Sequence, residues 1–163
     1  AKADALAYTG RLKYTGIAGL ELGMTAQYQE DLYQDTLADT IDATLLEAHA
    51  AWQVGDFGLR ALYAIWDIDD AINTIKEGAD EQTGWYIEPS WRISERWGVF
   101  ARYNDWDNLA GASVDGGITQ VDVGINYWLN PNVVFKFDYQ DQDTEDSDAK
   151  ELDGFNLGVG WQF

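Results

Sequence analysis

The chain has 163 residues, no cysteine and a formal net charge of −19 at pH 7. The lack of cysteine excludes a disulfide framework, a thiolate nucleophile and a cysteine-ligated metal, and the negative charge argues against a nucleic-acid partner. The mean hydropathy is −0.35, and no stretch approaches the roughly 18 apolar residues that mark a membrane-spanning helix. A protein that crosses a membrane with strands is not excluded, because such strands carry a much weaker signal per segment.

Large apolar side chains alternate with polar ones along most of the chain, and this period of two indicates strands with one apolar and one polar face. In the first segment Leu12 and Tyr14 belong to the apolar row, whereas Arg11 and Lys13 belong to the polar row. The same pattern recurs three more times in the first half of the chain. These four strands are expected at residues 6–14, 20–28, 46–54 and 57–65.

Five further segments repeat the alternation, and they are expected at residues 85–93, 97–104, 120–129, 133–140 and 155–163. Pro89 lies in the middle of the first of these, where it removes a backbone donor, so we expect a bulge or a sheet edge there. The sequence therefore predicts an all-β protein of nine strands.

The apolar rows of these segments contain no Asp, Glu, Lys or Arg. A lipid environment would exclude charged residues from these rows, since Arg or Lys at a lipid-facing strand position lowers the stability by about 2–4 kcal/mol at the midplane of the membrane. A soluble β-sandwich, with the apolar rows as its core, is the alternative. The segments are long for a soluble sheet, in which strands usually have about 5–6 residues, and aromatic side chains lie mostly toward the ends of the rows, as in interfacial girdles. These features favour a transmembrane antiparallel up-and-down β-barrel.

The connections between the segments alternate in length. Short ones are expected near residues 15–19, 55–56, 94–96 and 130–132, and long ones at residues 29–45, 67–83, 107–119 and 141–153. Outer-membrane barrels have short periplasmic turns and long extracellular loops, and most of the acidic residues fall in the long connections. Single-chain bacterial barrels have an even number of strands. Nine strands, of which the first starts outside, do not close, so we expect the C-terminal portion of a larger barrel domain.

Four stretches carry a resemblance to a known family: GWYIEPS at residues 84–90, VFARYNDWDN at 99–108, NYWLNPNVV at 126–134 and GVGWQF at 158–163. They resemble the C-terminal half of Gram-negative general porins and are most similar to the phosphate-selective porin O and P family. The resemblance implies a barrel of about sixteen strands, a homotrimer in the bacterial outer membrane, contacts with lipid and lipopolysaccharide, and a constriction loop folded into the channel. In that family, phosphate selectivity rests on lysine and arginine clusters.

The last segment looks like the closing strand of an outer-membrane barrel, which ends on an aromatic residue that the barrel-assembly machinery reads. The residues expected to form this assembly signal are Phe155, Leu157, Val159, Trp161 and Phe163.

The polar rows would face the lumen of such a barrel, where charged side chains bias ion selectivity. The expected pore-lining residues are Arg11, Lys13, Glu21, Glu47, His49, Arg60, Glu88, Arg92, Arg102, Asp122, Lys136 and Asp138. The alternative is that these bases and acids pair across strands and only keep the wall wet and rigid.

The sequence predicts neither an enzyme nor a cofactor. His49 is the only histidine, so a hydrolytic triad or a zinc site has little support. Asp141, Asp143 and Glu145 begin an acidic run that could hold Ca²⁺ or Mg²⁺ loosely and bridge to lipopolysaccharide phosphates. The run lacks the glycine that a calcium loop needs, and a solvated acidic loop is the simpler interpretation.

Together these features predict an outer-membrane porin, a water-filled channel for the passive diffusion of small hydrophilic solutes and ions. Two alternatives stay open. One is an outer-membrane barrel with an adhesive or structural role through acidic surface loops, and the other is a soluble β-sandwich that binds carbohydrate.

Overall fold

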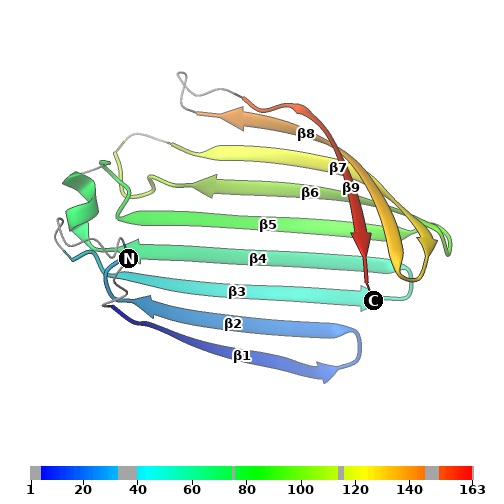
Figure 1. Ribbon diagram of the computed structural model, residues 1–163, viewed down its shortest axis with the longest axis horizontal. Coiled ribbons are helices and arrows are strands. Elements are labelled where there is room, and N and C mark those ends of the chain that lie inside the picture. The colour runs from blue at the N-terminus through cyan, green and yellow to red at the C-terminus, as the bar shows by residue number, and fades with distance from the viewer. Residues whose placement is uncertain (1–4, 33–39, 75, 114–115, 146–150, 163) are drawn as a thin grey trace.

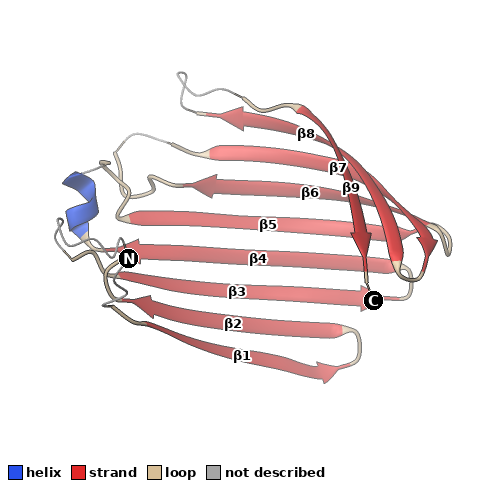
Figure 2. Cartoon of the chain, in the orientation of Figure 1, coloured by secondary structure: helices blue, strands red, loops and turns tan. Residues whose placement is uncertain are grey.

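The structure is a computed structural model in which residues 5–32, 40–74, 76–113, 116–145 and 151–162 are described. Its regular elements are strands, apart from one short 3₁₀ helix, η1 (Asp70–Thr74) (Figure 2). Among the described residues, no helix has the length and apolar character needed to cross a membrane. The prediction of nine strands is confirmed, and they are β1 (Ala7–Ile17), β2 (Leu20–Gln29), β3 (Ala43–Val54), β4 (Phe57–Ile68), β5 (Glu81–Arg92), β6 (Trp97–Asp107), β7 (Ile118–Asn130), β8 (Val133–Thr144) and β9 (Gly154–Trp161).

The strands form one antiparallel sheet in which each strand is hydrogen-bonded to the next along the chain, from β1 to β9 (Figure 1). The short turns lie at one end of the sheet, and the long connections and η1 lie at the other. Gly19 and Gly55 have φ values of 79° and 57°, the left-handed conformation that tight hairpin turns require. Within the described residues, the edge strands β1 and β9 of this sheet do not pair with each other.

The strands β1 to β8 extend further than the apolar rows suggested, whereas β9 ends at Trp161. β1 continues to Ile17, so its turn to β2 contains only Ala18 and Gly19, with a register shift between Tyr14 and Ile17. β4 reaches Ile68 and β8 reaches Thr144, so the connections toward β5 and β9 are shorter than expected. Backbone pairing does not stop at the first charged side chain, because the ladder bonds use only main-chain groups.

Pro89 is accommodated without a bulge or a sheet edge, so this expectation was wrong. β5 lies between β4 and β6, and Pro89 stands opposite Leu59 of β4 in an unbroken register. On the β6 side, the ladder lacks pairs at Glu88 and Pro89, and then resumes at Ser90 in the same register. The missing donor therefore removes ladder bonds locally, while the long strand around it keeps its alignment.

The apolar rows lie exposed on one face of the sheet. Leu22, Val123 and Phe137 expose 42%, 48% and 44% of their surface, and in the described part of the chain no second sheet covers them. A soluble sandwich would bury these side chains between two sheets. The exposed rows therefore do not favour the interpretation as a soluble carbohydrate-binding sandwich.

A small hydrophobic cluster forms at the end with the long connections. Its buried members are Ile41, Ala43, Ile68, Ile72 and Ala79. Ala43 of β3 stands opposite Ile68 of β4 on the face that carries the polar rows, and Ile72 belongs to η1. Since burying an isoleucine side chain contributes roughly 1.5–3 kcal/mol, this cluster packs the β4–β5 connection against that face.

Candidate functional site

The polar rows of the strands share one face of the sheet. Residues directly opposite each other in adjacent strands point to the same side. Glu21 stands opposite Ala51, Ala51 opposite Arg60, and Arg60 opposite Glu88. The register thus brings together on this face all of the residues that the sequence predicted to line a pore: Arg11, Lys13, Glu21, Glu47, His49, Arg60, Glu88, Arg92, Arg102, Asp122, Lys136 and Asp138.

This face is concave. It surrounds a hollow of about 1800 Å³, lined by residues of β3 to β8 and by the short turns. Aromatic side chains that the sequence analysis did not single out also line it. The ring of Phe100 lies over Gly124 and the ring of Trp128 lies over Gly98, where an added Cβ would come within 2.4 Å and 2.9 Å of ring atoms. The sequence shows glycines in the polar rows of these strands, which is a signal for close packing. Only the strand register shows which aromatic ring lies over each glycine.

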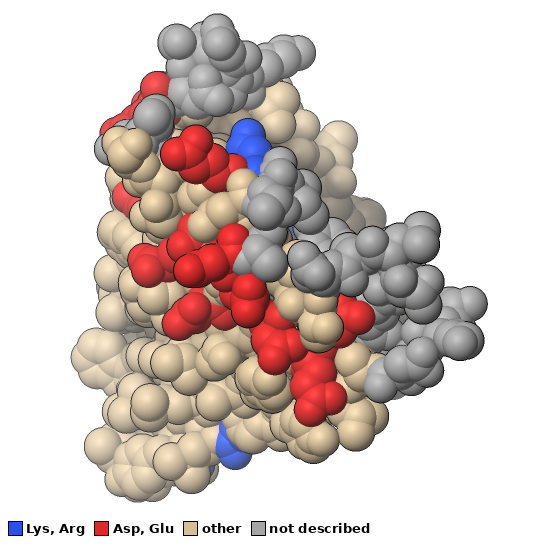
Figure 3. Space-filling view, turned by 90° about the vertical axis from the view of Figure 1, so that its left-hand side faces the viewer, with Lys and Arg blue, Asp and Glu red and all other residues tan. Residues whose placement is uncertain are grey.

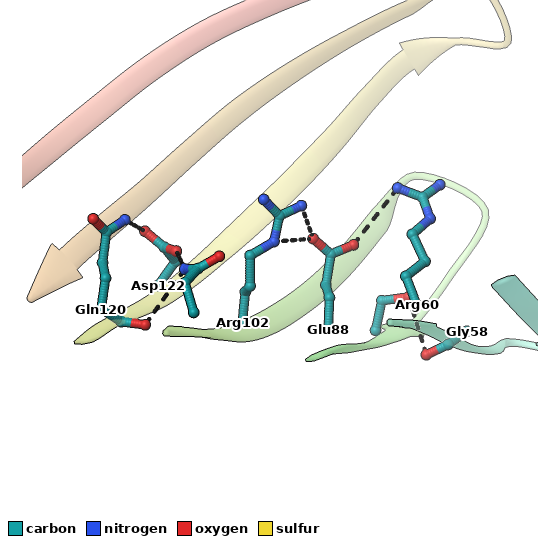
Figure 4. A network of polar contacts seen from close by, with 8 residues as sticks. Gly58, Arg60, Glu88, Arg102, Gln120 and Asp122 are labelled. Carbon is teal, nitrogen blue, oxygen red and sulfur yellow. Dashed lines mark hydrogen bonds and ion pairs between the residues drawn. The ribbon is translucent and has the colours of Figure 1, made fainter. Parts of the chain in front are cut away.

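Four charged residues, one on each strand from β4 to β7, form a row across the concave face (Figure 4). We call this group the β4–β7 row, and its members are Arg60, Glu88, Arg102 and Asp122. Arg102 donates from Nε to Glu88 Oε2 at 2.8 Å and also from Nη2 to the same oxygen, while Arg60 Nη1 lies 3.6 Å from Glu88 Oε1. Only 8% of Glu88 is exposed. The two guanidinium groups compensate this buried carboxylate, because a lone charge there would lose its hydration.

Asp122, at the far end of this row, is held by neutral donors. Asn104 Nδ2 and Gln120 Nε2 each donate to its carboxylate at 2.7 Å. The guanidinium carbon of Arg102 lies 4.6 Å from the centre of the Tyr86 ring, which fixes the arginine against the wall. With two bases and two acids, the β4–β7 row has no formal net charge.

A second group of charges occupies β1, β2 and β3, and we call Arg11, Lys13, Glu21, Glu47 and His49 the β1–β3 cluster. Lys13 Nζ contacts Glu21 Oε2, and Arg11 Nη2 lies 3.7 Å from Glu21 Oε1. His49 lies between the two carboxylates, with Nδ1 2.5 Å from Glu47 Oε1 and Nε2 3.6 Å from Glu21 Oε1. Like the β4–β7 row, this cluster balances two bases against two acids.

The remaining predicted residues lie nearer the short turns. Arg92 donates to the backbone carbonyls of Ser94 and Glu95 and stacks over Trp128, 3.7 Å from its ring centre. Asp138 accepts a hydrogen bond from Asn156 at 2.8 Å. Among the described residues, Lys136 has no ion pair, and it stands exposed on the concave face of β8. Most charges of this face therefore have a close partner.

The acidic residues gather at the opposite end, with the long connections, where they form a band (Figure 3). Some of them continue the apolar rows of the strands. We call these residues the acidic belt: Asp67, Glu81, Asp105, Asp141 and Asp143. Asp67 and Glu81 stand directly opposite each other, a like-charge pairing that destabilises a sheet. From the alternation, Asp67, Glu81, Asp141 and Asp143 were expected in the long connections and Asp105 at a strand edge, because the strands were expected to end with the apolar rows.

Asp42 lies just before β3 at the same end. It accepts hydrogen bonds from the Tyr28 hydroxyl at 2.6 Å and from the backbone N–H of Asp31 at 3.2 Å. These donors, the hydroxyl first, stabilise the ionised carboxylate and hold the pKa of Asp42 below its ordinary value. The carboxylate thereby ties the end of β2 to the start of β3.

The expected assembly signal lies on β9. Phe155, Leu157, Val159 and Trp161 project from its apolar face and are exposed by 70%, 84%, 55% and 69%. Phe163 lies outside the described residues. This edge strand thus presents its apolar row without cover in the described structure, and its role as a signal stays a prediction.

No group of three His, Cys, Asp or Glu side chains within the described ranges has the geometry to hold a metal ion. The acidic run that begins at Asp141 extends into residues 146–150, which lie outside the described part of the chain. Weak association of divalent cations with this run stays a prediction.

An antiparallel meander with an exposed apolar face and a charged concave face defines the wall of an outer-membrane β-barrel. β3, with 12 residues, spans about 28 Å of membrane at a rise of about 3.3 Å per residue and a tilt near 45°, which suffices for an apolar band of about 25 Å. Residues 1–147 match the Gram-negative porin family. The chain belongs to this family and is a protein of the bacterial outer membrane. No curated protein sequence matches it.

Solved structures show the same fold. OmpT, an outer membrane protein of Vibrio cholerae, superposes with a TM-score of 0.67 and 13% identity, covering 98% of this chain and 56% of that one. A porin refined at 1.8 Å resolution gives a TM-score of 0.68 and 19% identity, covering 98% and 52%. The trimer form of OmpT gives 0.64 and 14%, covering 93% and 54%. The chain therefore spans about half the length of these structures.

Proposed function

We propose that this chain forms part of the wall of a water-filled channel, through which small hydrophilic solutes and ions diffuse passively without catalytic turnover or a cofactor. The observation that carries this proposal is the segregation of the two faces. Uncharged rows are exposed on one side, and the predicted pore-lining residues lie on the other, where those of β4 to β8 line the hollow. Lipid excludes charge from the first face, whereas water in the lumen tolerates it on the second.

The pairing of charges supports a weakly selective channel for general solutes. Arg60 and Arg102 both lie against Glu88, and Arg11 and Lys13 both lie against Glu21. An anion in the lumen would have to compete with these carboxylates for the bases. For this reason we do not propose phosphate as the solute, although the sequence is similar to the phosphate-selective porin O and P family.

We also propose the arrangement of the complete protein. The short turns would face the periplasm and the long connections the cell exterior, as outer-membrane barrels show. The complete barrel would have about sixteen strands and assemble as a homotrimer, with the apolar row of β9 contacting the barrel-assembly machinery during biogenesis. Support for the trimer comes from the family and from the trimer form described for OmpT of Vibrio cholerae.

The acidic belt supports a contact with lipopolysaccharide. It lies where the apolar face ends, the level at which headgroup phosphates of the outer leaflet would lie, so divalent cations could bridge the two. Removing Mg²⁺ with a chelator should then lower the melting temperature in membranes that contain lipopolysaccharide, and the double variant Asp67→Asn/Glu81→Gln should lose this difference. An equal effect of the chelator on both proteins would contradict the contact.

Conductance of the full-length protein in planar lipid bilayers tests the channel. Stepwise current increases in KCl, with a reversal potential close to zero in a salt gradient, are expected from an open and weakly selective pore. Insertion should be checked separately by heat-modifiable mobility on a gel, which reports a folded barrel. A folded, inserted barrel that conducts no current would contradict the channel and favour the adhesive or structural role.

A further inference from the structure

The imidazole of His49 occupies a defined position in the β1–β3 cluster. Gly23 of β2 stands directly opposite His49, and a Cβ on Gly23 would come within 2.2 Å of His49 Cε1. The ring therefore lies directly over Gly23 of β2, and only 17% of the side chain is exposed. An alanine at position 23 could not coexist with this placement, so the glycine allows the ring to reach both Arg11 and the carboxylates.

The contacts of the ring indicate which tautomer its neutral form adopts. Arg11 Nη2 lies 3.3 Å from His49 Nε2, and a guanidinium group can only donate hydrogen bonds. In the neutral ring, Nε2 therefore accepts from Arg11, and the proton on Nδ1 is donated to Glu47 Oε1. In this state the imidazole is uncharged, and the β1–β3 cluster as a whole is neutral.

Protonation would break this arrangement. Both ring nitrogens of an imidazolium are donors, so Nε2–H would oppose the N–H of Arg11. The nearest other acceptor for Nε2 is Glu21 Oε1 at 3.6 Å, which Arg11 also approaches at 3.7 Å and whose carboxylate Lys13 already contacts. Proton uptake therefore adds one positive charge to the cluster and displaces Arg11 from the ring.

The other groups around His49 leave this charge uncompensated. Arg11 and Lys13 face it from β1, Glu21 from β2 and Glu47 from its own strand. On β4, Leu62 stands directly opposite His49. The nearest charge of β4 on this face, Arg60, lies against Glu88 and adds positive potential. No further carboxylate of the described residues faces the ring.

We propose that His49 is a specificity-determining residue of the channel: proton uptake by its imidazole makes the β1–β3 part of the wall positive and shifts passage from cations toward anions. Histidine is the side chain that ordinarily changes charge between about pH 5 and pH 8, whereas carboxylates ordinarily titrate near pH 4. The inference rests on the proposed channel function.

The test uses the full-length protein in planar bilayers, with the cation-to-anion permeability ratio taken from the reversal potential in a KCl gradient. From about pH 8 to about pH 5.5 in dilute salt, the ratio should fall about twofold, the effect of one unit charge several ångströms from the ion path. In about 1 M KCl the change should vanish, because the screening length shrinks to about 3 Å. His49→Gln, which offers both a donor and an acceptor but does not titrate, should abolish the change.

Two further variants move the response in opposite directions, which a purely structural histidine would not do. Glu47→Gln removes the negative charge that favours the imidazolium, so the midpoint of the change should move to lower pH. Arg11→Gln removes a positive neighbour, so the midpoint should move to higher pH. Lys136→Gln, on the same face of β8, is the matched control and should leave the midpoint unchanged. These variants also test the inference if His49→Gln fails to fold.

Each outcome decides between the two proposals. Absence of conductance in a folded barrel would overturn the channel and the inference with it. Conductance whose ion preference changes equally in wild type and His49→Gln would overturn the inference alone, and so would a wild-type ratio that is constant over this pH range. The inference is also overturned if Glu47→Gln and Arg11→Gln move the midpoint in the same direction.

Discussion

The apolar face and the concave face are made by the same nine strands, yet they depend on their residues in different ways. On the apolar face, Leu22 and Ala26 of β2 and Trp52 of β3 all belong to the apolar rows although they differ greatly in size. On the concave face, Glu88 is placed by Arg102, and His49 is placed by Gly23.

The two faces meet different surrounding media, and each medium restricts the side chains in its own way. Hydrocarbon requires only that no charge or unpaired polar group faces it, and it adapts to any shape. Water in contact with the concave face permits charged side chains there. Charges that lie close together on adjacent strands stabilise the sheet only if each is paired with a charge of opposite sign. The apolar face is therefore specified by composition and the concave face by pairing.

The largest expected effect is that of a charge on the apolar face. Val123 lies exposed near the middle of β7, and Val123→Arg should lower the free energy of unfolding by about 2–4 kcal/mol, because arginine must enter the hydrocarbon. Denaturant unfolding of the full-length protein in lipid vesicles measures this. Gln120→Arg, on the concave face of the same strand, keeps a donor for Asp122 and should cost much less. Equal losses in the two variants would mean that the faces are not distinguished by lipid.

An intermediate effect is expected within the β4–β7 row. Arg102→Ala removes both close donors from the buried carboxylate of Glu88, and leaving such a group poorly paired costs roughly 1–3 kcal/mol. Arg60→Ala removes a partner that is 66% exposed and 3.6 Å away, so it should cost less than about 1 kcal/mol. The same unfolding measurement applies. If Arg60→Ala proved the more damaging change, pairing with Glu88 would not govern the stability of the row.

The smallest effect is expected at Asp42, at the end of the sheet that carries the long connections. The pKa of Asp42 is held below its ordinary value by the Tyr28 hydroxyl and the Asp31 N–H. Its contribution to stability is therefore fully present above the ordinary carboxyl range, near about pH 4, and is lost as the pH falls through the lowered pKa. Thermal melts from neutral to acidic pH should show a smaller acid-induced loss in Asp42→Asn and in Tyr28→Phe than in wild type. Identical acid sensitivity in all three proteins would refute this contribution.

The alternation of side chains was sufficient to predict the strands and the side to which each side chain points. Arg11, Glu47 and Asp122 were assigned to the polar face from parity alone, and the register places them there. A period of two is a property of the extended backbone, so it holds in each strand regardless of its neighbours.

The strand ends and the accommodation of Pro89 could not be predicted in this way. The apolar rows stop where the lipid would stop, whereas hydrogen bonding continues through Asp67 and Glu81, because the backbone pairs without regard to side-chain polarity. Pro89 was expected to distort the sheet, but the two flanking strands keep β5 aligned on both sides of it. The packing of Ile72 against β3 and β4 also had no signal in the local pattern.

The pattern of residues alone was sufficient to assign the class of protein, because uncharged rows, charged opposite rows and long strands together suit a membrane. Which charges meet became clear only from the folded sheet. Glu88 and Arg102 lie 14 residues apart, and Arg11 and His49 lie 38 residues apart. Their contacts depend on the relative alignment of separate strands, which the turns and the full ladder of backbone bonds establish together.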